Sequence, residues 1–293
     1  MTKSNKIYVQ GYNCRGELGL GLENHTSQDL PKLLELNFES DIKMIKCGGL
    51  RTMIITERGD CFACGDNTDG ILGLGDTINR NTFQKLPIRD VTSVSFMVSS
   101  TFILTKLGCF VCGRNDSGQL GVGNNIRQIS LQKLGLPNII SVECGESHAF
   151  ALTRDSIYSW GTNGRGRLGL GHYEKQNTPQ KVEFWKHTNT TARVVSIRCT
   201  ENVPTLFLTI LGELFVCGNH KKSYFHFDYP YAPGQIFAKL NWNKFVVSIN
   251  CGHNHIIATT KNGDIYSWGY QIEHPLETYE YEPRKLEFIH ENY

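Results

Sequence analysis

The stretch Gly166-Arg-Leu-Gly-Leu-Gly171 begins five residues after Gly161, and three earlier parts of the chain repeat the phrase at the same distance from a glycine. These copies are Gly16-Glu-Leu-Gly-Leu-Gly21 after Gly11, Gly70-Ile-Leu-Gly-Leu-Gly75 after Gly65, and Gly118-Gln-Leu-Gly-Val-Gly123 after Gly113. Two later predicted strands end in a similar way, at Gly218 and Gly269. A period of about 50 residues indicates one supersecondary unit stacked on copies of itself, so the repeat decides the architecture before any single residue is considered.

The clearest copy of the unit, residues 139–182, is typical of four short antiparallel strands. A two-residue connection of hairpin length, 154–155, joins the second run to the third, which ends at Gly161. A long loop then carries the glycine phrase to a short fourth strand. Four such strands with a glycine-rich loop describe a β-propeller blade. The expected strands are 139–144, 149–153, 156–160 and 179–182.

The same register returns in five complete sets of strands. The expected first strands are 42–47, 91–96, 139–144, 194–199 and 246–251. The expected third strands end at Cys64, Cys112, Trp160, Cys217 and Trp268. The expected fourth strands are 83–86, 131–134, 179–182, 234–237 and 283–286. No stretch with helical periodicity competes with these strands.

The two ends of the chain do not complete a further set. The sequence opens with a strand of the third type at 7–11 and one of the fourth type at 31–34. Because a closed propeller hides the edges of its terminal strands, we expect both termini to complete a partial sixth blade, with 287–293 adding a partial strand. The expected fold class is all-β, a β-propeller of antiparallel four-stranded blades with about five full blades and a partial sixth closed by the termini. We expect one domain over 1–293, with repeats starting near 7, 61, 109, 156, 213 and 265.

Two kinds of residue are expected to be structural. Trp160 and Trp268 end third strands and should be buried between blades as core anchors. Glycine is expected where the chain turns back tightly at positive φ and packs against its neighbour. These structural glycines are Gly65, Gly113, Gly161 and Gly269.

The composition is that of an ordinary globular protein. The 293 residues include 30 basic and 28 acidic side chains, so the net charge of +2 gives no long-range attraction for nucleic acid. The N-terminal residues lack the apolar core of a secretory signal, and no apolar run approaches the roughly 18 residues that a membrane span needs. We therefore expect a cytoplasmic and/or nuclear protein that does not bind membranes and, without a basic arm, does not bind nucleic acid.

The ten cysteines include the pairs Cys61/Cys64 and Cys109/Cys112, whose spacing invites a zinc site. Both pairs lie in expected strands, where residues three apart point to opposite faces and cannot share one ion. Cys251, His253 and His255 have a spacing that places all three on one side of a strand, so a metal site is considered there too. Cys251, however, occupies the core position shared with Cys47, Cys144 and Cys199. We expect buried, reduced thiols, with no metal and no cofactor.

Two phrases resemble the repeat of the regulator of chromosome condensation family over nearly the whole chain. The family phrase Leu-Tyr-x-Trp-Gly-x-Asn matches Ile157-Tyr-Ser-Trp-Gly-Thr-Asn163, and a second phrase ending Cys-Gly-x-x-His matches 139–148 and 249–255. A kelch propeller is a weaker alternative, because its double glycine occurs once, at Gly48-Gly49. The founding member of the family has seven blades, a basic N-terminal arm and a wedge that displaces nucleotide from the GTPase Ran. In this sequence we expect no matching wedge insertion, and the first expected strand already begins at Ile7.

The order of strands places the turn between the first and second strands at the same end of a blade as the glycine loop. The resemblance implies that acidic residues and histidines of these turns contact a GTPase, whereas capping of the tight turns by local hydrogen bonds is the alternative. After Gly218 an aromatic-rich segment replaces the glycine phrase and suits an interface, or else a local cluster. The candidate partner-binding residues are Arg51, Glu146, His148, Glu201, His253, His255, Tyr224, Phe225, Phe227 and Tyr229.

No bond-making chemistry is expected of this chain. The glycine phrases lack the strand-to-helix context of a phosphate loop, and the sequence contains no Gly-Lys-Ser/Thr. The spacing assembles no nucleophile, base and orienting acid. The resemblance implies a protein partner, a small GTPase of the Ran, Rho or Rab kind, with guanine-nucleotide exchange as the sharpest expectation. The alternatives are a non-catalytic scaffold and a chromatin-binding module.

Overall fold

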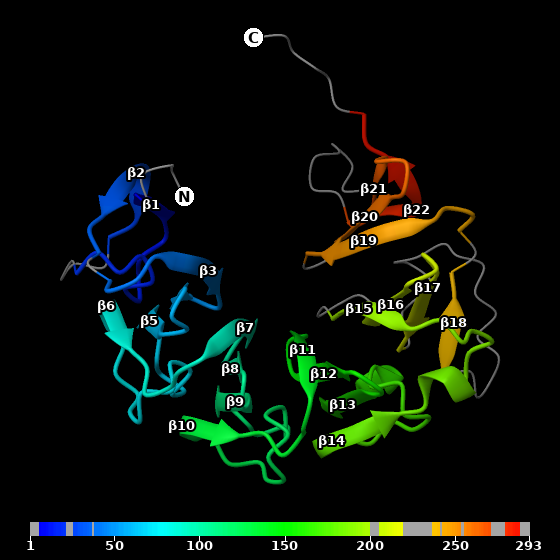
Figure 1. Ribbon diagram of the computed structural model, residues 1–293, viewed down its shortest axis with the longest axis horizontal. Helices are drawn as coiled ribbons and strands as arrows, with labels where there is room; N and C mark the ends of the chain where they lie inside the picture. Colours follow the sequence, from blue (N-terminus) through cyan, green and yellow to red (C-terminus); the bar gives the residue numbers. More distant parts are fainter. Residues whose placement is uncertain are drawn as a thin grey trace. The chain divides into compact units, whose positions relative to one another are not determined.

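The computed structural model of the chain is built almost wholly from antiparallel β-sheets (Figure 1). It describes residues 6–21, 26–36, 38–199, 205–218, 236–240, 242–252, 255–270 and 279–287, and all structural statements below concern these residues. They form five four-stranded sheets and one two-stranded sheet. Their two helices are 3-10 turns at Gly164–Gly166 and Phe184–Lys186. Neither turn is long and apolar enough to cross a membrane.

The chain divides into two compact units, of which unit 1 comprises Met1–Val142 with Asn177–Pro179. It contains the two-stranded sheet and two complete blades, each with its strands in chain order across the sheet. The two-stranded sheet is β1 (Ile7–Gly11) with β2 (Gln28–Leu34). The complete blades are β3 (Ile42–Gly48), β4 (Arg51–Thr56), β5 (Cys61–Gly65) and β6 (Arg80–Lys85), then β7 (Val91–Met97), β8 (Ser100–Thr105), β9 (Gly108–Gly113) and β10 (Gln128–Lys133).

Unit 2 comprises Glu143–Gln176 with Gln180–Tyr293, and the boundary between the units falls within β11 and β14. Its sheets have the same order of strands. The first is β11 (Ile139–Cys144), β12 (His148–Thr153), β13 (Ile157–Gly161) and β14 (Gln176–Val182). The second is β15 (Val194–Arg198), β16 (Thr205–Thr209), β17 (Leu214–Cys217) and β18 (Phe237–Lys239). The third is β19 (Val246–Cys251), β20 (His255–Thr260), β21 (Ile265–Tyr270) and β22 (Tyr279–Lys285).

The expected set of five full blades and one partial blade is confirmed. Fourth strands begin earlier than the apolar pattern predicted, as at β6, where pairing resumes at Gly65 with Arg80 after a register shift. These outer strands are polar, so hydrophobic periodicity does not mark their starts. The prediction of 234–237 was wrong in register, because β18 begins at Phe237 and no glycine phrase precedes it. The tail 288–293, expected to close the sixth blade, lies outside the described residues.

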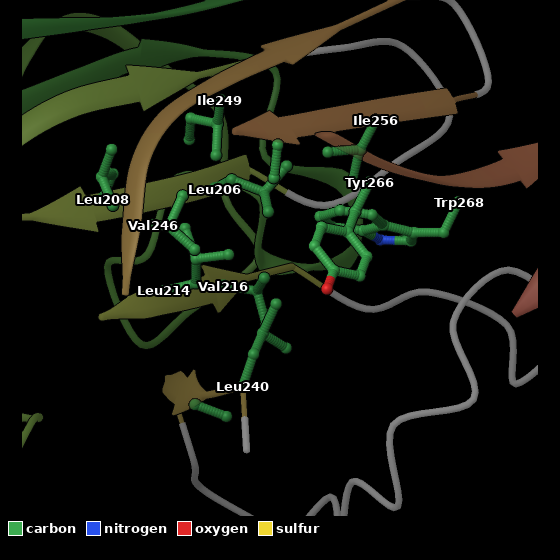
Figure 2. Packing of buried hydrophobic residues seen from close by; sticks show 12 residues of the cluster. Leu206, Leu208, Leu214, Val216, Leu240, Val246, Ile249, Ile256, Tyr266 and Trp268 are labelled. Atoms are coloured by element: carbon green, nitrogen blue, oxygen red, sulfur yellow. The ribbon is translucent and has the colours of Figure 1, made fainter. Parts of the chain in front are cut away.

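The core forms where the second strand of one blade covers the first strand of the next. In unit 1, Met53 and Ile55 of β4 pack in one buried cluster with Val91 and Val94 of β7. Figure 2 shows the same arrangement in unit 2, where Leu206 and Leu208 of β16 lie in one cluster with Val246 and Ile249 of β19. Phe150 of β12 meets Val194 and Ile197 of β15 in a third cluster. Within each unit, the core is thus formed by contacts between successive blades.

The two tryptophans that were expected to anchor the core are both 0% exposed. Trp268 packs edge-on against Trp242, with ring centroids 5.7 Å apart. Trp160 pairs across the sheet with Ala149, and Trp268 with Ile256, so each large ring lies opposite an apolar residue.

In the other three complete blades a cysteine replaces the tryptophan and a threonine lies opposite it. Thr52 and Cys64 both approach the main-chain carbonyl of Glu17 in the preceding glycine loop, at 2.7 and 3.5 Å. The equivalent groups are Thr101 and Cys112 on Ile71, and Thr205 and Cys217 on Arg167. Each hydroxyl and thiol donates to a loop carbonyl, so this position links one repeat to the loop of the previous one.

The paired cysteines therefore have separate neighbours. Cys61 belongs to a buried apolar cluster, whereas Cys64 contacts a loop carbonyl. Burial raises the pKa of the Cys61 and Cys112 thiols to about 12 in each case. Both thiols therefore stay protonated at neutral pH and serve the packing.

Candidate partner-binding surface at the glycine-loop end

A buried asparagine holds each of the four glycine loops from inside. Asn67 is fully buried, its Oδ1 accepts from the main-chain N–H of Leu72 at 2.9 Å, and its Nδ2 donates to the carbonyl of Asp76 at 3.0 Å. The equivalent bonds are Leu18 N–H to Asn13, Leu120 N–H to Asn115 and Leu168 N–H to Asn163. The loops are therefore fixed by their own interior, and the side chains outside are presented in defined positions.

The turn between the first and second strands lies against the start of the glycine loop. Asp66 N–H donates to the Leu50 carbonyl at 2.9 Å. A Cβ on Gly65, which has φ +109°, would lie 2.4 Å from that carbonyl, so only glycine fits there. The same bond joins Arg114 to Ser99 and Thr162 to Ser147. We call the end of a blade that carries this turn and the glycine loop its glycine-loop end.

Arg51, expected to contact a partner, lies inside unit 1 and is 1% exposed. Its guanidinium donates to the carbonyls of Met97, Val98 and Ser100 at 2.8, 3.0 and 2.7 Å, and lies 4.3 Å from the centre of the Phe96 ring. Arg51 thereby ties the β3–β4 turn to the β7–β8 turn of the next blade. Because Arg51 is buried, its side chain cannot touch a partner, and the expectation of a partner contact was wrong. Arg51 instead positions the two turns.

His148 is buried as well, although it was expected at the surface. Its ring lies over Gly145, where a Cβ would come within 2.2 Å of Cε1, and its Nε2 is 3.5 Å from Thr205 Oγ1 in the next blade. Burial first, and the charge of Arg167 second, lower the pKa of His148 to about 3. The imidazole is therefore neutral at physiological pH and fills a space between repeats. The prediction that His148 contacts a partner was wrong, and it is a positioning residue instead.

Glu146 and His255 are exposed at the glycine-loop end of unit 2, so both stay candidates for contact with a partner. A Cβ on Gly252 would lie 2.2 Å from the His255 ring, the same relation as between Gly145 and His148. Packing therefore explains the phrase Gly-x-x-His, because the imidazole lies against the glycine and leaves no room for a Cβ there. Glu201, His253, Tyr224, Phe225, Phe227 and Tyr229 lie outside the described residues.

Two apolar side chains that the sequence argument did not single out stand exposed at the glycine-loop end of unit 1. Leu50 is 47% exposed at the tip of the β3–β4 turn, and Val98 is 61% exposed at the tip of the β7–β8 turn. A Cβ on Gly49 would lie 2.6 Å from the Val98 carbonyl, so the two tips are adjacent. Leu50 has φ +59°, a conformation that costs a branched side chain on the order of 1 kcal/mol. An exposed leucine at such a position points to a role at the surface.

Charged side chains of the glycine loops lie at the same end of these blades. Arg114 and Asp116 form an ion pair at 2.7 Å with both side chains half-exposed, and Arg127 reaches Asp69 at 3.4 Å. The hydrogen bond from Arg114 lowers the pKa of Asp116, which keeps this carboxylate ionised. The glycine-loop end of unit 1 thus carries both exposed apolar tips and charged side chains, two kinds of residue that protein interfaces combine.

The described residues hold no group of three or more His, Cys, Asp or Glu side chains arranged to bind a metal ion.

In unit 2, Arg198 of one first strand contacts residues of two other first strands. Its Nη1 pairs with Glu143 at 3.0 Å, and its Nε donates to the Ile249 carbonyl at 3.0 Å. These contacts stabilise the packing of the blades.

The sequence held signals that our argument did not use. An asparagine follows two residues after the glycine of four third strands, and that regular spacing marks the loop clamp. Leu50 and Val98, in contrast, stand in turns that repeat no common residue. Only the folded turns bring them together, through Arg51.

Models of the regulator of chromosome condensation (RCC1) repeat match residues 108–152 and 154–203, and a second model of the same repeat matches 139–167 and 246–271. The human X-linked retinitis pigmentosa GTPase regulator is 41% identical over 83 residues, which are 28% of this chain and 8% of that protein. The mouse secretion-regulating guanine nucleotide exchange factor is 36% identical over 107 residues, 35% of this chain and 22% of that protein. The matched segments thus span a small part of these relatives' length.

Two solved structures share the fold over nearly the whole chain. Human WBSCR16 superposes with a TM-score of 0.78 at 22% identity, covering 96% of this chain and 78% of the other. Yeast RCC1 (Prp20), solved with Kap60 bound, has a TM-score of 0.66 at 19% identity, covering 97% and 84%. These likenesses establish a fold in common.

Proposed function

The chain is built from regulator of chromosome condensation repeats and has the β-propeller fold of that family, and from this premise we propose that it regulates a small GTPase through its glycine-loop end. One observation carries the proposal. Leu50 and Val98 expose adjacent apolar tips on turns that buried Arg51 holds in place, at the end of the blades that also carries the ion pair of Arg114 and Asp116. Apolar side chains that are already fixed in position favour binding, because little conformational entropy is lost when a partner covers them.

Two relatives support a GTPase as the partner. One is named a GTPase regulator and the other a guanine nucleotide exchange factor. We propose a GTPase of the Ran, Rho or Rab kind and exchange-type activity on it. The chemistry of exchange needs no catalytic residue of the bond-making kind, because it requires only that the bound partner holds its nucleotide less tightly. A scaffold without exchange activity is the alternative, and the experiment below separates the two.

The test is a pull-down of nucleotide-free GTPases of the three classes, followed by release of a fluorescent guanine nucleotide. Leu50→Asn suits the positive φ of this turn and removes the apolar tip, so we expect unchanged or slightly higher stability and a loss of partner binding of about tenfold or more. Val98→Asp should weaken binding in the same way. Leu107→Asn is the matched control, since Leu107 is 73% exposed in the β8–β9 hairpin at the other end of its blade.

Binding that survives Leu50→Asn and Val98→Asp but is lost in Leu107→Asn would show that the opposite end of the blade is the working surface. A bound GTPase that releases nucleotide no faster would establish the scaffold reading. Glu146→Gln probes the glycine-loop end of unit 2 without the core damage that a change at His148 would cause.

A further inference from the structure

Two positions at the end of a blade opposite its glycine-loop end change from polar to apolar in unit 2. We call this end, which carries the hairpin between the second and third strands, the hairpin end. The residue before the first strand is Phe245 at β19, and in the other complete blades it is Asp41, Asp90, Asn138 or Arg193. The residue after the second strand is Ile210 at β16, and in the others it is Glu57, Lys106, Arg154 or Lys261. The blade therefore folds without an apolar residue at either position.

Ile210 and Phe245 belong to one continuous surface of unit 2. The Ile210 main-chain N–H donates to the Arg193 carbonyl at 2.9 Å. Gly212 in the same hairpin lies against the Phe245 ring, because a Cβ there would come within 2.8 Å of Phe245 Cδ1. Lys261 Nζ lies 5.5 Å from the centre of that ring. The hairpin of one blade thus meets the start of the next blade at this surface.

The apolar side chains of this surface are open to solvent. Ile210, Leu211 and Phe245 are between 44% and 58% exposed, and we call these three residues the hairpin-end patch. Exposed apolar side chains that gather in one place, in contrast to scattered ones, mark interaction sites.

Two β-bulges add apolar residues at the same end of unit 2. The pairing of β15 and of β19 shifts across Val195 and Val247, and both valines are exposed. In unit 1 the equivalent bulges of β3 and β7 carry the polar residues Lys43 and Thr92. Bulges re-aim a side chain and are frequent beside functional sites.

A cleft of about 270 Å³ opens beside the patch. Leu211, Trp242 and Phe245 are among its lining residues, and Figure 2 shows two more, Leu214 and Leu240, in the buried cluster. Trp242 packs edge-on against buried aromatic rings at 5.0 and 5.7 Å between centroids, so its position is fixed. The volume is just below the range of about 300–1,000 Å³ for small-molecule sites, and the cleft therefore suits one large side chain.

The charge around the patch is positive. Arg193, Lys244 and Lys261 are exposed, and none of them forms an ion pair with another described residue. Glu213 and Asp264, the carboxylates of the two adjacent hairpins, are each paired with a different lysine, at 2.5 and 2.7 Å. The patch is therefore complementary to a partner that supplies carboxylates.

An anionic membrane surface is less well matched than a polypeptide. Clusters that bind anionic lipids carry about four to eight Lys or Arg residues, and only Arg193, Lys244 and Lys261 stand here. A cleft for one side chain, with exposed apolar groups and cations around it, has the features of a site for a protein segment.

We propose that the hairpin-end patch and its cleft bind a short acidic segment of another protein. The segment inserts one large apolar side chain beside Leu211 and Phe245, and its carboxylates pair with Arg193, Lys244 and Lys261. This site lies at the other end of the blades from the glycine-loop end, so the inference is independent of the proposed GTPase.

The test uses fluorescein-labelled peptides Gly-Glu-Asp-X-Glu-X-Asp-Gly, in which X is Phe, Leu or Trp, and a matching set with lysine in place of each acid. By fluorescence anisotropy we expect at least one acidic peptide to bind saturably and at least about tenfold tighter than its lysine counterpart. Added salt should weaken this binding, because the cations are exposed.

Leu211→Asn and Phe245→Asn each introduce the residue that another repeat has at the same position, Asn262 and Asn138. Each change should weaken binding by about tenfold or more. Leu107→Asn is the matched control, because Leu107 is the exposed leucine at the position of Leu211 in unit 1. It should leave affinity within about twofold. Circular dichroism checks that each variant is folded.

Reversal of charge separates binding from a structural role. With Lys244→Glu and Lys261→Glu combined, we expect the lysine peptide to bind more tightly than the acidic one. A merely structural role of the two lysines would not reverse the preference, so an unchanged preference for the acidic peptide would overturn the proposal.

The proposal would also be overturned if no acidic peptide bound saturably, or if Leu211→Asn and Phe245→Asn both kept the affinity of the parent chain. Two other results would assign the patch to a different occupant and overturn it as well. One is sedimentation with phosphatidylserine vesicles in the absence of peptide binding, which would assign a membrane. The other is a dimer in light scattering that Leu211→Asn dissociates, which would assign a second copy of the chain.

Discussion

At the scale of single residues, buried polar side chains hold the repeats together. Arg51 and His148 sit at equivalent places at the start of second strands, and each reaches from its own blade to the next. The asparagine clamps act within one repeat instead. Arg51 is stable in the interior because its terminal N–H groups donate to main-chain carbonyls, and His148 because its imidazole is neutral. Their removal therefore costs more than an exposed contact would.

Asn115→Ala should show the strength of the clamp. It leaves the Leu120 amide and the Asn124 carbonyl without their partner, so we expect a loss of about 2–4 kcal/mol in the free energy of unfolding. Urea denaturation followed by fluorescence measures it. Asn243→Ala, at an exposed residue, is the control and should change stability by less than about 0.5 kcal/mol. Equal effects of the two changes would show that the clamp is not formed.

The depressed pKa of His148 predicts a pH dependence of stability. The unfolded chain binds a proton at this residue below about pH 6.5, while the folded chain does not until about pH 3. Stability from this group is thus present above pH 6.5 and is lost as pH falls toward 3, by about 1.4 kcal/mol per pH unit. Between pH 7 and pH 5, His148→Asn should lose about 2 kcal/mol less than the parent chain does. Identical losses in both proteins would mean that His148 is accessible to protons.

At the scale of elements, the glycine loops should behave as fixed structure. The amides of Gly70, Leu72, Gly73 and Gly75 all donate to protein acceptors, two of them on Asn67. We expect these amides to exchange with deuterium as slowly as those of the neighbouring strand β5, because loop opening requires the clamp to break. Residue-resolved hydrogen exchange by NMR measures this. Exchange of the loop amides within the dead time would contradict a rigid glycine-loop end.

Trp160 shows what a single anchor contributes to packing between strands. It is 0% exposed and lies opposite Ala149. Trp160→Ala would leave a cavity that the sheet cannot close, so we expect a loss of about 3–5 kcal/mol in a denaturant titration. A loss below about 1 kcal/mol would mean that the register of β12 and β13 is wrong.

At the scale of the whole molecule, the expectation of one domain over 1–293 stays a prediction. Stability in repeat proteins is the sum of each repeat and its contacts with neighbours, and strong contacts make unfolding cooperative. If the chain is one domain, calorimetry should give a single transition with equal calorimetric and van't Hoff enthalpies. Two resolved transitions would show that the units, Met1–Val142 with Asn177–Pro179 and the remainder, unfold separately.

The sequence by itself determined the blade. Glycine spacing, period-2 strands and the tryptophan positions are local patterns, and they predicted the first strands within one residue and the partial blade at the start of the chain. The starts of the fourth strands were mispredicted, because these strands are polar and no apolar residue marks where they begin. The start of β18 was mispredicted because its repeat lacks the glycine phrase.

Only the tertiary structure decided which of the candidate polar residues are buried and which are exposed. Arg51 and His148 look like surface residues in the sequence, yet both are buried. Arg51 contacts the β7–β8 turn of the next blade and His148 contacts Thr205 at the start of β16, in each case a residue more than 45 positions away. Leu50 and Val98 look like ordinary apolar residues, yet their turns present them outward. The partial blade was visible in the sequence as an incomplete set of strands. That Ile42 and Ile45 pack against Ile7 and Leu34 of the partial blade follows only from contacts between blades, because the exposure of a side chain depends on the neighbouring repeat.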